Sequence, residues 1–308
     1  ILTIGHEGQQ QGQARLNKVK FIDNMANCEG GGGGSGLWLS QTETYTLTEC
    51  EFIRNTNTGD SNGGALGYTP GTSSNAKILL EFDRCFFQDN KVKSSFNGGS
   101  LYIKAQYRPV IIKGCVFSNT IEDAATRGGA IYIDGNTNQE ISITNTEFRN
   151  MKVTEPNSNS GNALFIENGT SNVFIQDCKF YDCGSNNKGC CIYSSGKNVI
   201  VERTNVTFTQ TTSACKGILI PIKSHFELID STISNCVSTS NGGAFSYRDG
   251  LKEANDLESD YTENLVFINT IIDNCESGNG RAMFMTLTSY NTTFNNLIIQ
   301  HVKARTGF

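Results

Sequence analysis

Short apolar segments recur along the chain, and each predicts one or two short β-strands. In LNKVKFIDN, from Leu16 to Asn24, an apolar residue is followed five positions later by a second one. Ten such copies align, and both positions are apolar in every copy. The first column is Leu16, Leu47, Phe82, Ile112, Ile143, Ile175, Val201, Leu228, Phe267 and Phe294. The second is Phe21, Phe52, Phe87, Phe117, Phe148, Phe180, Val206, Ile233, Ile272 and Ile299. Units of 3–6 residues that alternate and are rich in β-branched and aromatic side chains are typical of strands.

A second signature contains glycine and precedes another short apolar run, as in RGGAIYI from Arg127 to Ile133. Its glycine column is Gly34, Gly63, Gly98, Gly128, Gly161, Gly189, Cys215, Gly242 and Gly280. A phosphate-binding loop occurs once per site and is followed by a helix. Glycines that recur in nearly every copy, each followed by a strand, instead predict a tight corner where φ is positive or the backbone approaches closely.

The copies repeat every 26 to 39 residues, and the insertions fall between the signatures. A helical solenoid of this period would need stretches of 10–15 residues with a 3.6-residue periodicity, and none is visible. The pattern predicts an all-β, single-stranded parallel β-helix of about nine to ten coils that forms one domain over residues 1–308. Each strand would pair with its counterpart one coil away, at about 4.8 Å.

The paired signatures resemble the polymorphic outer membrane protein repeats of chlamydial surface proteins, whose motifs are G-G-A-[ILV] and F-x-x-N. The first is seen in the runs that begin at Gly63, Gly128 and Gly242. The second is seen as Phe21…Asn24, Phe52…Asn55 and Phe87…Asn90. From Phe117 onward the asparagine often lies one place earlier, as at Asn119, Asn150, Asn235 and Asn274. The resemblance implies a right-handed β-helix of the pectin-lyase-like shape, in an adhesin or another cell-surface protein.

Composition and modification motifs favour an extracellular or cell-surface location. The net charge of -5 does not indicate nucleic-acid binding, and no apolar run reaches the roughly 20 residues of a membrane span. Eleven cysteines and three N-x-S/T sequons, at Asn168, Asn205 and Asn291, point the same way. Asn205 is predicted to point outward beside inward Val206, whereas Asn168 and Asn291 are predicted to lie in loops. We expect a glycan on at least one of them.

The cysteines fall into the same columns as the repeat. Cys50, Cys85, Cys115 and Cys178 share one inward position, where they can act as small buried apolar residues. Cys236 and Cys275 occupy one position in adjacent coils, and Cys190 and Cys215 lie in adjacent corners. We therefore expect disulfides between Cys236 and Cys275 and between Cys190 and Cys215, because stacked Cα atoms fall within disulfide range.

An aromatic residue follows the inward leucine or isoleucine of the glycine signature in several copies. Alternation turns these side chains outward, so they predict a ladder of rings on one sheet face. The ladder is Trp38, Tyr102, Tyr132, Phe165 and Tyr193. One interpretation is that the rings stabilise one another and the sheet. The other is a partner surface, covered by a glycan, a loop of the same chain or a second solenoid.

No set of residues predicts catalysis or metal binding, so we expect no enzyme activity, cofactor or metal. A carbohydrate-processing site would need acidic residues at matching positions in two or three neighbouring coils, and none is evident. The acidic insertion from Arg248 to Asn264 lacks the spacing of an EF-hand. The sequence favours a structural or adhesive surface protein that binds glycans, copies of itself or other surface proteins. Because both ends break within a coil, a segment of a longer chain or a filament subunit is expected. The alternative is a carbohydrate-active enzyme or glycan-binding module.

Overall fold

The computed structural model describes most of the chain, and every regular element in the described part is a β-strand. The described residues are 2–4, 12–29, 33–40, 44–70, 79–93, 95–105, 109–120, 125–135, 140–153, 160–167, 171–184, 189–209, 214–220, 224–239, 241–247, 263–278, 281–285 and 290–304. Within these residues no helix is long and apolar enough to cross a membrane.

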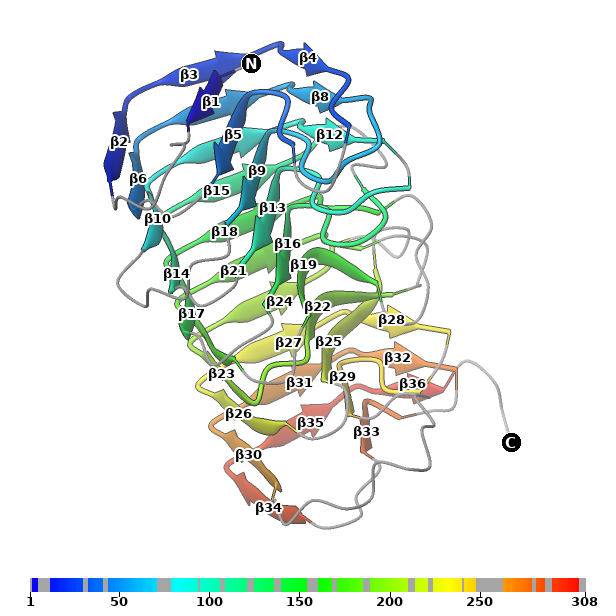
Figure 1. Cartoon of the computed structure of the whole chain (residues 1–308). Helices are drawn as coiled ribbons and strands as arrows, with labels where there is room; N and C mark the ends of the chain where they lie inside the picture. The colour runs from blue at the N-terminus through cyan, green and yellow to red at the C-terminus, as the bar shows by residue number, and fades with distance from the viewer. Residues whose placement is uncertain are drawn as a thin grey trace, which may run out of the picture.

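Three long parallel sheets, here called A, B and C, run along the molecule, and each contains ten strands (Figure 1). Sheet A contains β1 (Leu2–Ile4), β5 (Leu37–Ser40), β9 (Leu66–Thr69), β13 (Leu101–Lys104), β16 (Ile131–Asp134), β19 (Gly161–Glu167), β22 (Cys190–Ser194), β25 (Lys216–Ile220), β29 (Phe245–Tyr247) and β33 (Met283–Met285). Sheet B contains β2 (Gln13–Asn17), β6 (Thr44–Thr48), β10 (Leu80–Asp83), β14 (Val110–Lys113), β17 (Glu140–Thr144), β20 (Asn172–Gln176), β23 (Asn198–Glu202), β26 (His225–Ile229), β30 (Glu263–Ile268) and β34 (Tyr290–Asn295).

Sheet C completes each coil, and two short sheets follow it at the ends of the molecule. Sheet C contains β3 (Lys20–Ile22), β7 (Glu51–Ile53), β11 (Phe86–Gln88), β15 (Val116–Ser118), β18 (Glu147–Arg149), β21 (Lys179–Tyr181), β24 (Asn205–Thr207), β27 (Thr232–Ser234), β31 (Ile271–Asp273) and β35 (Ile298–Gln300). The short sheets contain β4 (Met25–Ala26), β8 (Thr56–Asn57) and β12 (Lys91–Val92), and β28 (Val237–Ser238), β32 (Glu276–Ser277) and β36 (Lys303–Ala304).

The structure confirms the predicted parallel β-solenoid and the alignment behind it. Leu16 pairs with Leu47, and Leu47 with Phe82, and both predicted apolar columns continue in register along sheets B and C. The six phenylalanine rings from Phe21 to Phe180 stack with centroid separations of 4.5–5.1 Å. Because these rings lie inside the solenoid, each buries a large apolar surface against both neighbouring coils.

The corner between sheets B and C contains one residue in the left-handed region in every coil, with φ between 45° and 63°. These residues are Lys18, Glu49, Arg84, Gly114, Asn145, Asp177, Arg203, Asp230, Asn269 and Asn296. Such a conformation costs a non-glycine residue about 1–2 kcal/mol. Side-chain contacts between successive coils offset part of this cost. Arg84 donates to Glu49 at 3.1 Å, and Asn269 donates to Asp230 at 2.8 Å.

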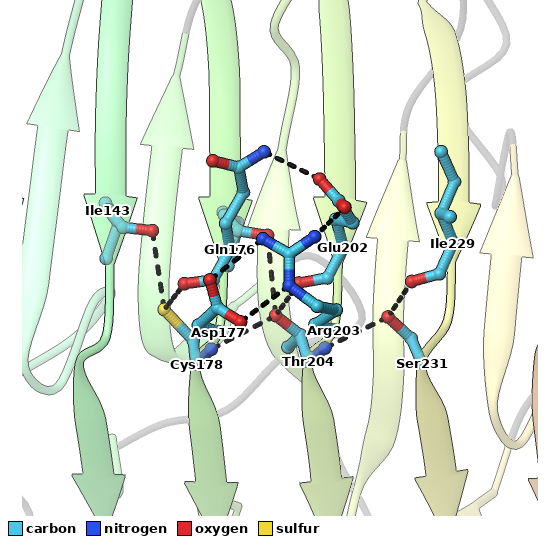
Figure 2. Close-up of polar contacts among 10 residues, drawn as sticks. Ile143, Gln176, Asp177, Cys178, Glu202, Arg203, Thr204, Ile229 and Ser231 are labelled. Atoms are coloured by element: carbon cyan, nitrogen blue, oxygen red, sulfur yellow. Dashed lines mark hydrogen bonds and ion pairs between the residues drawn. The ribbon is translucent and has the colours of Figure 1, made fainter.

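The next residue at this corner points inward, and in the coils from Cys50 to Thr270 its hydroxyl or thiol joins successive coils (Figure 2). The Thr204 hydroxyl accepts the Cys178 backbone N–H at 3.4 Å and donates to the Glu202 carbonyl at 3.0 Å. The Thr204 N–H in turn donates to the Ser231 hydroxyl at 3.1 Å. The Cys178 thiol donates to the Ile143 carbonyl of the preceding coil at 3.4 Å. This corner column therefore satisfies backbone groups that would otherwise be buried without a partner.

The glycine corner explains why the two sequence signatures occur together. Gly128 has a φ of +60°, and a Cβ atom there would lie 2.2 Å from the Ile131 carbonyl oxygen. A Cβ on the next glycine, Gly129, would lie 2.6 Å from the Lys152 carbonyl oxygen, in the stretch that follows the second signature. The first glycine is therefore required by its conformation, and the second by close backbone packing.

Candidate functional site

The candidate site is the outer face of sheet A, which carries the predicted aromatic ladder. The alignment of the ladder is confirmed, because Tyr102 pairs with Tyr132, Tyr132 with Phe165, and Phe165 with Tyr193. The ring centroids of these three pairs lie 5.6, 5.1 and 4.2 Å apart. The four rings are nearly parallel, so they form one continuous stack.

These four rings lie outside the solenoid core, as predicted, but they are not open to solvent. Tyr102 and Tyr132 are each 6% exposed, Phe165 is 2% exposed and Tyr193 is 8% exposed. They form a second apolar cluster with Cys190 and Leu219, separate from the solenoid core. Trp38, at 39%, is the exposed member of the ladder. The chain itself therefore covers these four rings, which is one of the coverings expected for the ladder.

Polar groups of the same chain contact the covered rings. The Tyr132 hydroxyl donates to the Glu167 carboxylate, and the Tyr102 hydroxyl hydrogen-bonds to the Asn62 side chain. The Arg127 guanidinium lies over the Phe165 ring, 5.2 Å from its centroid. Burial raises the pKa of Tyr102 to about 12 and that of Tyr193 to about 12. The phenols of Tyr102 and Tyr193 therefore stay protonated at physiological pH.

A row of charged side chains lies two residues beyond the ladder on the same face. Lys104 pairs with Asp134 in the register of sheet A, and Asp134 pairs with Glu167. Lys104 and Asp134 are half-buried, and Glu167 is exposed. Burial and the nearby Glu167 carboxylate raise the pKa of Asp134, and Lys104 partly opposes this. Lys104, Asp134 and Glu167 are called the charged row below.

The charged row is the group of matching acidic residues that the sequence analysis did not find. Two carboxylates in adjacent coils, one with a raised pKa, are the arrangement from which general acid–base chemistry on a glycosidic bond can be built. The signal was present in the sequence, because each residue lies three positions after an aligned Leu101, Ile131 or Leu164. The outward positions around the second signature, on sheet C, contain no such match, whereas the ends of the sheet A strands do.

Both expected disulfides are contradicted, because all eleven cysteines are free thiols. Cys190 pairs with Lys216, not Cys215, and it lies in the cluster outside sheet A, whereas Cys215 lies in the solenoid core. The alignment itself was right, because it matched Gly189 with Cys215, but the one-position offset between Cys190 and Cys215 puts their side chains on opposite sides of the sheet. Cys236 and Cys275 do occupy adjacent positions and hydrogen-bond to each other. Stacking in a parallel ladder points their Cβ atoms the same way, which does not favour a disulfide.

The four cysteines of the corner column are buried, as predicted. Hydrogen bonding to Cys115 is the largest influence on Cys85 and raises the pKa of its thiol to about 12. Burial raises the pKa of Cys178 to about 12. The Cys85 and Cys178 thiols are therefore protonated and donate to backbone carbonyls at this corner.

The sequons lie in three different settings. Asn205 is exposed on β24 beside buried Val206, as predicted. Asn291 is exposed too, but it belongs to β34 rather than to a loop, so that prediction is wrong. Pairing with β30 begins at Tyr290, ahead of the core position of Phe294, and so it includes Asn291, which pairs with Asn264. Asn168 lies outside the described residues, as does most of the acidic insertion.

No group of three or more His, Cys, Asp or Glu side chains in the described ranges is arranged to hold a metal ion. In comparisons with known proteins, no family model, curated protein or solved structure matches the chain.

Proposed function

We propose that the chain is a non-enzymatic structural or adhesive solenoid of the cell surface or extracellular space. The observation that carries the proposal is the use of polar side chains to join neighbouring coils. Lys20 pairs with Glu51 at 2.9 Å, and Arg203 pairs with Asp177 at 2.7 Å, each across one coil boundary. Lys18 and Arg84 both pair with Glu49 from the coils on either side of it. Such pairs on exposed faces are suited to a rigid rod rather than to substrate turnover.

The same proposal includes the finer features that the resemblance implies. We expect the coils to be right-handed and related to the polymorphic outer membrane protein repeats, with glycans, copies of the chain or other surface proteins as partners. The close packing of Gly129, in the glycine signature, against the backbone at Lys152, just after the second signature, supports this relationship to the repeat family, because it explains why the two signatures occur together. Parallel crossover connections are right-handed in about 98% of cases. Asn205 and Asn291, both exposed, are the expected glycosylation sites.

The proposal is tested with the purified chain on cells and in solution. We expect binding to cell surfaces or to itself, measured by flow cytometry and by sedimentation, and no release of product from a panel of polysaccharides. Mass spectrometry of native material is expected to find glycan at Asn205 or Asn291. A chain that remains monomeric, binds no surface and cleaves a polysaccharide would refute the structural role.

The charged row favours one alternative, a carbohydrate-active or glycan-binding protein. Asp134 and Glu167 would be its acidic groups, and Lys104 would contact a sugar carboxylate or hydroxyl. Under this alternative, Asp134→Asn and Glu167→Gln abolish cleavage or weaken glycan binding. Glu140→Gln is the matched control, because Glu140 is an exposed carboxyl on sheet B, opposite Asn172 in the register. Equal behaviour of all three variants would exclude the charged row as the site.

A further inference from the structure

The charged row contains two like charges at the closest lateral spacing that a parallel sheet allows. Asp134 on β16 and Glu167 on β19 are register partners on the outer side of sheet A. Neighbouring strands lie about 4.8 Å apart, and like charges directly opposite each other destabilise a sheet. Asp134 is half-buried, so water screens the repulsion less than it would on an open surface.

The surroundings of the pair favour one shared proton over two full charges. Tyr132 donates its hydroxyl to Glu167, so one side of the pair already accepts a hydrogen bond. Lys104 lies on the other side of Asp134 in the register and attracts its charge. In the described residues, the other titratable or charged groups of this face include Tyr102, Tyr193, Cys190 and Arg127. Tyr102 lies within electrostatic reach of both carboxylates and Tyr193 within reach of Glu167, whereas Arg127 lies over the Phe165 ring.

We propose that Asp134 and Glu167 form an acid-sensitive pair that binds one proton in the folded chain and thereby makes sheet A more stable in mildly acidic solution than in neutral solution. The proton would reside on Asp134, because Glu167 already accepts the Tyr132 hydroxyl. The protonated Asp134 carboxyl could then donate across the register to Glu167. This inference does not depend on the adhesive role, and it holds equally for an enzyme or a glycan-binding protein.

The sign of the effect follows from proton linkage. The pKa of Asp134 in the folded chain lies above its ordinary value of 3.8, so between these two values the folded chain binds more protons than the unfolded chain. Stability therefore increases as the pH falls through the folded-state pKa, and the increase is complete near 3.8. Paired carboxylates elsewhere, such as Asp23 beside Arg54, have lowered pKa values and contribute in the opposite direction.

The test compares urea unfolding of the wild type, Asp134→Asn and Glu167→Gln over pH 8 to 4. At neutral pH we expect both variants to unfold at a higher urea concentration than the wild type, by on the order of 0.1–0.5 M, because the repulsion is removed. This difference should shrink as the pH falls. The Glu140→Gln variant should show the same change of unfolding urea concentration with pH as the wild type. Variants that are less stable at neutral pH, or a difference that does not change with pH, would overturn the proposal.

A direct titration keeps the test valid if a variant does not fold. Carbon-13 NMR of aspartate carboxyls in the wild type, with the Asp134 signal assigned from its loss in Asp134→Asn or Asp134→Ser, measures the protonation of this group. We expect a midpoint above 3.8 in the wild type. The midpoint should fall in Glu167→Gln. A wild-type midpoint at or below 3.8 would refute the shared proton.

Discussion

Replacement of Thr204 by valine tests whether the corner column stabilises the solenoid through its hydroxyl and thiol groups. Threonine and valine have nearly the same shape, so the change removes the hydroxyl and leaves packing intact. The Cys178 N–H would lose its acceptor, 3.4 Å away, and the Glu202 carbonyl would lose a donor at 3.0 Å. Thr204 is 1% exposed, so water cannot easily replace either partner.

The expected cost can be estimated from the buried groups left without partners. One buried donor or acceptor that loses its partner costs about 1–3 kcal/mol. The hydrogen bond from the Cys178 N–H is long, so its loss should cost an amount near the lower end of this range. The Glu202 carbonyl has a second lone pair that can accept other hydrogen bonds, so the loss of its donor should cost little more. We therefore expect Thr204→Val to lower the free energy of unfolding by about 1–3 kcal/mol. Thr204→Ser retains the hydroxyl and should lose less than half as much.

Urea unfolding followed by circular dichroism measures the total effect, and amide hydrogen exchange measures where it acts. In Thr204→Val, exchange of the Cys178 N–H should accelerate, whereas exchange of the Phe87 N–H, several coils away, should be unchanged. A valine variant as stable as the wild type, together with a serine variant that is less stable, would show that packing rather than hydrogen bonding decides this column.

Three further changes test other parts of the fold. Gly128→Ala places a Cβ 2.2 Å from a carbonyl oxygen at a φ of +60° and should cost more than about 2 kcal/mol in thermal or urea unfolding, whereas Gly135→Ala, where φ is not positive, should be tolerated. Phe117→Ala, in the middle of the core stack, should cost about 3–5 kcal/mol, and half-buried Phe86→Ala clearly less; similar losses would contradict the core assignment. Iodoacetamide should modify the native chain at Cys28 alone, which is partly exposed, and all eleven cysteines in urea; rapid native labelling of Cys115 would contradict its burial.

The sequence predicted the fold well because the repeat places residues of one kind in register. The two apolar columns that begin at Leu16 and Phe21 could be aligned from the sequence alone, because the same type of side chain recurs at the same position of successive copies. The same alignment predicted that Tyr102, Tyr132, Phe165 and Tyr193 leave the core. It left open whether a glycan, a loop of the same chain or a second solenoid covers them, and the structure shows that the chain itself does.

The wrong prediction of disulfides and the missed charged row have different causes. Cys190 and Cys215 differ by one position, and in a sheet one position exchanges the inner and outer sides. Two consecutive residues at the glycine corner, such as Ala130 and Ile131, both face the core, and simple alternation does not anticipate this. The charged row could have been found from sequence, had the alignment been extended three residues past Leu101, Ile131 and Leu164.

The corner between sheets B and C also determines how such a chain can change in length. Its left-handed residue and the inward residue after it are present in every coil, whereas insertions are confined to the other two connections. Each coil contacts mainly the coils on either side of it. Duplication or loss of one whole coil would therefore restore every column on both sides of the junction. Insertion of a single residue into this corner would shift every later strand in its coil and reverse its inner and outer faces.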